Sequence, residues 1–367
     1  MPIEPMDQLI AKIGKGWKGA KDLTWEEAKR AFHAIVKGEA TPTQVGAFLM
    51  AMRIKTESIS ELGAFTAAAR EYVAPLQVPH AANMVDVPLY GEKHHTVHII
   101  IAASLVATSA GAGMLLHGVD SPHTSSDLTR ILALLGIPVA LSVSDITQQL
   151  SQRAWVYADL AGYHAPLTRL LDLRREFGVQ NLAHQVARLL NPARLPSQVI
   201  GIAHPPYLDK MAEALDMLGA KRALIIQGVE GFPELSISAP STARELRSSH
   251  ISTLTFRPQD AGLRNGPFQA MSQGAATDTA SIPAQEAALI QALLTNRQEG
   301  DQRAWVIFNA ALLIYAAGVA PSLAQATPLA VHALDSGKAG ALLQSMAKEP
   351  KTQEQIPSSP QPVTVSS

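Results

Sequence analysis

Four lysines near the N-terminus have the residue type and the spacing needed to contact a row of phosphates. They recur every three residues: Lys12, Lys15, Lys18 and Lys21. No acidic residue lies between Gln8 and Asp22, and three glycines in the same stretch predict a flexible loop rather than an ordered helix. Such a loop can fit its amines to a nucleic-acid backbone, and Trp17 can stack on a base. The alternative is an ordinary solvated loop with Trp17 folded into the core.

A group of histidines offers a second candidate chemistry, metal binding. His94, His95 and His98 include two imidazoles at an i, i+4 spacing, which would share one face of a helix. No carboxylate or further histidine follows at a spacing that would complete a metal site. Histidine pairs at helix starts are common, so we expect no metal here.

The overall composition gives no general electrostatic attraction for nucleic acid, membranes or acidic substrates. The chain has 30 Lys and Arg against 31 Asp and Glu, so any attraction must come from local clusters. Hydrophobic residues make up 47% of the 367 residues, enough for one large core and a smaller domain. There are no cysteines, no apolar signal segment at the start and no apolar run near the roughly 20 residues of a membrane span. These features predict a cytoplasmic protein without a membrane partner.

The first 75 residues contain repeated helix start signals. Each is a capping residue three positions before a Glu or Gln: Thr24 with Glu27, Thr41 with Gln44, and Ser58 with Glu61. The pattern predicts three helices. The middle helix is apolar on more than one face over residues 45–52, so we expect it to be buried between its neighbours or across a subunit interface.

From residue 84 onward, short β-branched runs alternate with helical stretches. Strands are predicted at 84–87, 114–116, 155–157, 199–202 and 223–226, with helices near 96–108, 127–135 and 207–218. This alternation is typical of an α/β domain with a mainly parallel sheet. The apolar run 97–112 predicts a buried helix, and 167–194 is helical and rich in arginine. Residues 349–367 are rich in Pro, Ser, Gln and Thr, which predicts a disordered tail.

Three segments near the C-terminus carry a family resemblance: FNAAL at 308–312, YAAG at 315–318 and LDSGKA at 334–339. Together they resemble the anthranilate phosphoribosyltransferase family, glycosyltransferase family 3. The resemblance covers most of residues 20–346. It implies the nucleoside phosphorylase/phosphoribosyltransferase fold, with a small helical domain (1–75, to which 167–194 returns) and a large α/β domain (84–347).

The loops that hold pyrophosphate in that family are degraded in this chain. The family's Gly-Thr-Gly-Gly-Asp loop corresponds to PLYGE at 88–92, where Gly91 remains and Lys93 follows. The family's Lys-His-Gly-Asn turn corresponds to LHGV at 116–119, where His117 and Gly118 remain. The resemblance therefore implies a degenerate ligand pocket.

The metal pair and the aromatic-acid subsite are also altered. The family's Asp-Glu pair reads Pro233-Glu234, and one carboxylate rarely holds Mg²⁺ without a phosphorylated ligand that shares it. Glu230 is a candidate to replace the missing carboxylate. The family's acceptor-binding arginine matches Arg174, whereas the family's Gly-Pro-Leu run is replaced by Ala187-Arg188-Leu189, which puts Arg188 into space that a small ligand would need. Four damaged elements together argue against phosphoribosyl transfer.

A closer resemblance suggests a different activity. The Ile-Gly-Lys-Gly start at 13–16 and the Arg-Ile-Lys step at 53–55 resemble the divergent YbiB-type branch of the family, whose members keep the fold and bind nucleic acid without evident sequence preference. The resemblance thus predicts a DNA- or RNA-binding homodimer, paired through its N-terminal helices. The expected phosphate contacts are Lys12, Lys15, Lys18, Lys21, Arg53, Lys55, Arg174 and Arg175.

Two other interpretations stay open. The first is a phosphoribosyltransferase with an altered acceptor, which would use Lys93, Arg174 and Glu234 and would need Mg²⁺. The second is a small-molecule sensor that uses the remodelled pocket. The nucleic-acid-binding interpretation requires no cofactor, no metal and no catalytic residue.

Overall fold

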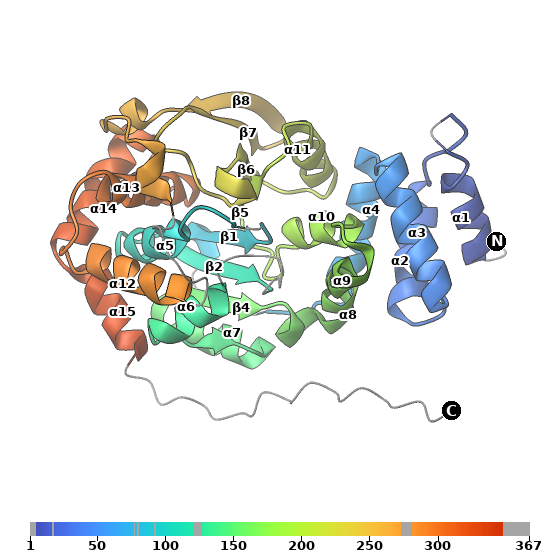
Figure 1. The fold of residues 1–367 in the computed structure, drawn as a ribbon. Coiled ribbons are helices and arrows are strands. Elements are labelled where there is room, and N and C mark those ends of the chain that lie inside the picture. The colour runs from blue at the N-terminus through green and yellow to red at the C-terminus, as the bar shows by residue number, and fades with distance from the viewer. Residues whose placement is uncertain are drawn as a thin grey trace.

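The computed structural model describes residues 5–16, 18–76, 78, 81–91, 93–119, 127–272 and 281–347. Trp17 and the tail 349–367 lie outside the described residues. A small helical bundle lies beside a large α/β unit (Figure 1). No helix within the described ranges is long and apolar enough to cross a membrane.

The bundle consists of helices α1 (Met6–Ile13), α2 (Trp25–Val36), α3 (Pro42–Lys55) and α4 (Ile59–Arg70). All three predicted capping boxes are present, at Thr24, Thr41 and Ser58. The prediction of a flexible loop across the whole lysine stretch was wrong at its beginning. Helix α1 includes Lys12, because its apolar face buries Leu9 and Ile13 and the helix packs on α3.

In the described part of the chain, eight strands form one sheet in the order β3-β4-β2-β1-β5-β6-β7-β8. The strands are β1 (Met84–Leu89), β2 (Gly113–Gly118), β3 (Val139–Ala140), β4 (Trp155–Asp159), β5 (Ser197–Ile202), β6 (Arg222–Gln227), β7 (Ser241–Arg247) and β8 (His250–Phe256). Strands β1 to β6 pair in parallel, whereas β7 and β8 add an antiparallel edge. All five predicted strands are confirmed, and the sheet is mainly parallel as expected.

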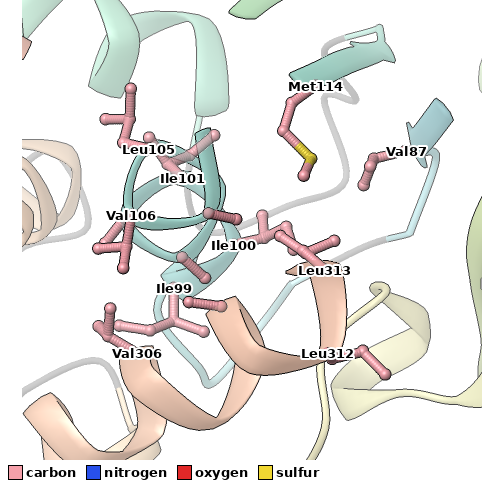
Figure 2. Close-up of a cluster of buried hydrophobic side chains, with 14 of the residues drawn as sticks. Val87, Ile99, Ile100, Ile101, Leu105, Val106, Met114, Val306, Leu312 and Leu313 are labelled. Atoms are coloured by element: carbon pink, nitrogen blue, oxygen red, sulfur yellow. The ribbon is translucent and has the colours of Figure 1, made fainter. Parts of the chain in front are cut away.

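Successive side chains of the strands point to opposite faces of the sheet, and each face has its own core. One face is covered by α5 (Ile99–Ser109), α6 (Leu128–Leu134), α12 (Ile282–Leu294), α13 (Asp301–Ala316), α14 (Leu323–Asp335) and α15 (Lys338–Ala347). Figure 2 shows Ile100 of α5 beside Leu313 of α13, with Val87 and Met114 of the strands next to them. Helix α5 is buried on all sides, as its apolar sequence predicts.

The opposite face is covered by α7 (Val143–Arg153), α8 (Ala161–Asp172), α10 (Leu182–Arg188) and α11 (Tyr207–Met217). Helix α10 packs on α3 and α4 of the bundle, and the short α9 (Arg174–Phe177) follows α8 (Figure 1). The Arg70 guanidinium of α4 donates to the carbonyl oxygens of Leu189 and Leu190 at the end of α10. The helical segment after β4 therefore joins the bundle to the sheet.

Candidate functional site

Lys93 lies in the loop between β1 and α5, and its side chain is fully buried. The Nζ atom donates to Glu234 Oε2 at 2.5 Å, to Thr96 Oγ1 at 2.9 Å and to the Val97 carbonyl oxygen at 2.8 Å. The three ammonium protons thus have three acceptors inside the protein. Lys93 faces the interior rather than a ligand pocket.

Glu234, which the sequence resemblance matches to one carboxylate of the family's metal pair, is fully buried beside Lys93. Its second oxygen accepts the amide of Ile100, in the first turn of α5, at 2.9 Å. Burial raises the pKa of the Glu234 carboxyl, an effect that Lys93 and the Ile100 amide oppose. Magnesium requires several oxygen ligands. Here the Lys93 ammonium is already bonded to the Glu234 carboxylate. These residues do not fit a divalent cation, and no group of three or more potential ligands occurs elsewhere in the described residues.

Glu230 belongs to the short helix η2 (Val229–Gly231) after β6. Its carboxylate accepts the amides of His94 at 2.9 Å, His95 at 3.1 Å and Thr96 at 2.9 Å, and the Thr96 hydroxyl at 2.5 Å. Burial would raise the pKa of Glu230, but the hydrogen bonds from Thr96 and His94 and the Lys93 charge outweigh burial and lower it. Consecutive amides that converge in this way form an anion-binding nest. The Glu230 carboxylate therefore occupies this nest, and these bonds give no support to a role for Glu230 as a metal ligand.

Glu286 of α12 is a further carboxylate that accepts a backbone amide of this loop. Its carboxylate accepts the His98 amide at 2.9 Å and lies 2.9 Å from Nδ1 of the same buried histidine. The amides of residues 97, 99 and 101 donate to the carbonyl oxygens of Met271, Val97 and His98. Every amide from residue 94 to residue 101 thus has an acceptor inside the protein. His94 is exposed and precedes α5, so it shares no helix face with His98.

The second pocket loop is also filled by the protein's own side chains. His117, at the end of β2, is buried, with Nδ1 2.9 Å from the hydroxyls of Tyr90 and Tyr163 and Nε2 3.2 Å from Asp86 Oδ1. Burial raises the pKa of both tyrosines, so their hydroxyls stay protonated and can donate. The buried Arg188 guanidinium donates to the Tyr90 carbonyl oxygen at 2.7 Å. Tyr90 and Arg188 therefore fill the protein interior beside this loop.

The two retained glycines allow close packing around this filled pocket. A Cβ atom at Gly91 would lie 2.5 Å from the Phe232 ring. A Cβ atom at Gly118 would lie 2.9 Å from both the Leu89 carbonyl oxygen and the Tyr157 hydroxyl. Both positions thus require glycine for packing alone.

Arg174 is half-buried on α9 and belongs to a cluster of cationic side chains. Burial lowers the pKa of Arg174, and the nearby Arg53 of α3 lowers it further. Burial also lowers the pKa of His184 on α10 to about 3, with added repulsion from Arg188, Arg174 and Arg53. The bundle and α9–α10 thus bring three arginines together at their junction. Arg175, like Arg53, is exposed.

The predicted phosphate-contacting lysines differ in their surroundings. Lys12 Nζ lies 2.6 Å from Glu27, and Lys55 Nζ lies 2.5 Å from Asp22 and 2.7 Å from Glu61, with the Lys55 side chain only 7% exposed. Both ammonium groups are therefore already paired with carboxylates of the same chain. The remaining three lysines, Lys15, Lys18 and Lys21, are exposed.

Asp86, Tyr163 and Glu286 were not predicted from the sequence as site residues. Two of them carried a signal that could have been used. Asp86 is the one acid in the apolar strand β1, and Glu286 is the one acid in helix α12, which is otherwise largely apolar. Because an unpaired buried carboxylate is costly, such isolated acids predict a specific buried partner.

Two family models match the chain. The glycosyl transferase family a/b domain matches residues 84–340, and the glycosyl transferase family helical bundle domain matches residues 7–73. The anthranilate phosphoribosyltransferase of Moorella thermoacetica is 33% identical over 338 residues, covering 92% of this chain and 97% of the relative. The enzyme of Chromobacterium violaceum is 32% identical over 326 residues, covering 89% and 93%.

Solved structures agree with these matches. The anthranilate phosphoribosyltransferase of Thermus thermophilus has a TM-score of 0.77 at 27% identity, covering 93% of this chain and 98% of that chain. The Saccharomyces cerevisiae enzyme in complex with PRPP and Mg has a TM-score of 0.78 at 16% identity, covering 93% and 96%, and supports the fold alone. The relatives named here are transferases, so they support the phosphoribosyltransferase-like interpretation and offer no support for nucleic-acid binding.

Proposed function

The chain belongs to glycosyltransferase family 3, the family of the anthranilate phosphoribosyltransferases, and we propose that it uses this scaffold to bind DNA or RNA without sequence preference. The observation that carries the proposal is the occupied donor loop. Glu230 fills the amide nest at residues 94–96, and Lys93 sits on the carboxylate that would face the metal. A sugar diphosphate donor could therefore bind neither to the amides of residues 94–96, which Glu230 occupies, nor through a divalent cation at Glu234, which Lys93 occupies.

The exposed cations suggest where nucleic acid would bind instead. Lys15, Lys18 and Lys21 lie on one loop, and the Asp22–Lys55 ion pair ties this loop to the end of α3, where Arg53 is exposed. Arg53 in turn lies near Arg174. We infer that the loop, the helix end and α9 present their cations to the same nucleic-acid strand. Phosphate contacts of this kind give affinity without reading the base sequence.

Binding of fluorescently labelled DNA and RNA across a salt series tests the proposal. Each phosphate contact should contribute a slope of about −0.9 in log K against log[salt] on duplex DNA and about −0.7 on single strands. Changing Lys15, Lys18 and Lys21 together to Ala should therefore flatten the slope by about 2–3 units for each lysine loop that contacts the nucleic acid, for all sequences alike.

A matched control removes the same charge elsewhere. Lys37, Lys221 and Lys338 are also exposed, and changing all three to Ala should leave the slope nearly unchanged. Equal effects of the two triple variants would mean that net charge, not this set of cations, governs binding. A parent protein that does not bind at low salt would overturn the proposal.

The comparisons favour a second candidate, a phosphoribosyltransferase with an altered acceptor. The relatives match over about nine-tenths of the chain. The sequence resemblance matches Arg174 to the family's acceptor-binding arginine. In this case Lys93 and Glu234 would have to separate before donor and Mg²⁺ could bind. Turnover of a sugar diphosphate donor with anthranilate or another aromatic acceptor, at ~1–10³ per second, would establish this candidate.

A further inference from the structure

Four charged side chains surround the loop and helix start at residues 93–101, three of them buried and one, Glu230, half-buried. The carboxylates come from three separate elements: Glu230 from η2, Glu234 from the segment after it, and Glu286 from α12. The cation is Lys93. The N-terminus of α5 and its preceding amides favour negative charge, which explains why carboxylates gather there.

We propose that these side chains are internal replacement ions that hold the family's donor site closed. Glu230, Glu234 and Glu286 occupy the amides that would bind a diphosphate, and the Lys93 ammonium occupies the place of a divalent cation. These contacts inhibit ligand binding. A diphosphate can bind only if Glu230 releases the amides of residues 94–96, and a divalent cation can bind only if Lys93 moves away from Glu234. This inference concerns the donor site and does not depend on nucleic-acid binding.

The backbone around Glu230 supports this assignment. Glu230 has φ +51°, in the left-handed region that a non-glycine residue rarely adopts. Two glycines flank Glu230 and allow this turn. Gly231 has φ +80°, and a Cβ atom at Gly228 would lie 1.6 Å from the Phe232 carbonyl oxygen. Such a strained turn persists where surrounding contacts maintain it, here the four hydrogen bonds to the Glu230 carboxylate.

The proposal predicts a gain of binding when a side chain is removed. The Glu230→Ala variant exposes the amides of residues 94–96 and the Thr96 hydroxyl, four donors without their carboxylate. Inorganic pyrophosphate has the charge and the acceptors to replace it. Calorimetry should therefore measure at least about tenfold tighter pyrophosphate binding to this variant than to the parent, a difference of about 1.4 kcal/mol.

The matched control is Glu299→Ala, which removes the same charge from an exposed side chain of the α/β unit. It should bind pyrophosphate as weakly as the parent. The proposal is overturned if Glu230→Ala gains no affinity, or if Glu299→Ala gains as much. Since the nucleic-acid assay uses the exposed lysines, a failure here leaves that result unaffected, and the reverse also holds.

A second measurement needs no variant and so does not depend on the folding of Glu230→Ala. Amide hydrogen exchange of residues 94–96 in the parent should already be slow without ligand. Adding pyrophosphate with Mg²⁺ should leave these exchange rates unchanged, because the amides are bonded to Glu230. Marked slowing on addition of pyrophosphate and Mg²⁺ would overturn the proposal.

Discussion

A buried ammonium group is stable only where each proton has an acceptor and negative charge lies close by. Lys93 meets both conditions through Thr96, Val97 and Glu234. The rings of Phe232 and Trp305, with centroids 5.1 and 5.8 Å from Nζ, add a favourable cation–π contribution. Removing one partner of such a pair is costly because the other charge stays buried.

Replacing Lys93 by Met should therefore lower the free energy of unfolding by about 3–5 kcal/mol. Methionine keeps much of the volume but removes the charge that Glu234 faces. Urea unfolding followed by circular dichroism measures the change. The same substitution at the exposed Lys338 should stay within ~0.5 kcal/mol of the parent.

The double variant Lys93→Met with Glu234→Gln separates charge from packing. The double variant leaves neither member of this pair charged, so much of the lost stability should return, and the two substitutions should be strongly non-additive. Additive losses in this cycle would mean that Lys93 contributes through packing rather than through its charge.

This pair also marks a limit of prediction from the sequence. Lys93 and Glu234 were both identified as remnants of a ligand site, each from its own local motif. They lie 141 positions apart, and no local pattern indicates that they bond to each other. Their contact depends on how β1, β6 and α5 are placed in the sheet. The sequence therefore predicted a degraded site, whereas its occupation by internal charges required the fold.

At the scale of the elements, short-range signals were reliable. The three capping boxes are local, because the cap and its partner are three residues apart, and all three formed as predicted. Helix α1 was missed because its cap is Pro5, which makes no side-chain hydrogen bond. The β7–β8 hairpin was missed because its turn uses Ser248 and Ser249 at positive φ, where glycine or asparagine is the usual signal.

The cap of α2 should make stability depend on pH. Burial opposes ionisation of Glu27, but Lys12 and the Thr24 groups outweigh burial and hold the pKa of Glu27 at about 2, below its unfolded value of 4.5. A lowered folded pKa contributes stability that is complete above 4.5 and is lost as the pH falls toward 2.

Glu27→Gln should therefore destabilise the protein by about 1 kcal/mol near neutral pH, the usual value of a cap, and by less near pH 2. Thermal unfolding at several pH values measures the difference. Glu26, exposed in the same first turn, provides the control as Glu26→Gln. A Glu27→Gln effect that does not shrink at low pH would contradict this assignment.

At the scale of the whole molecule, the sheet carries two cores, and the bundle packs against the core on one face only. The apolar spread over residues 45–52 led us to expect pairing of two bundles. Much of this apolar surface is buried within one chain, since Phe48, Leu49 and Met52 are almost completely buried. A substitution at Leu49 would thus disturb the fold and could not test pairing. Among the described residues of the bundle, Ile54 at the end of α3 is the large apolar side chain with high exposure, 71%.

We therefore expect a homodimer through the N-terminal helices, with Ile54 at or near the contact. An exposed isoleucine at an interface loses apolar burial and gains a desolvated charge when it becomes glutamate, so Ile54→Glu should be monomeric at micromolar concentration. Leu134→Glu, at a 53% exposed position on α6 of the α/β unit, should leave the dimer intact. Sedimentation velocity separates the two states. A monomeric parent, or equal behaviour of both variants, would place the interface elsewhere or remove it.

Pairing matters for binding because a dimer carries two lysine loops. Two loops can neutralise twice as many phosphates of one nucleic-acid strand, and the salt slope scales with that number.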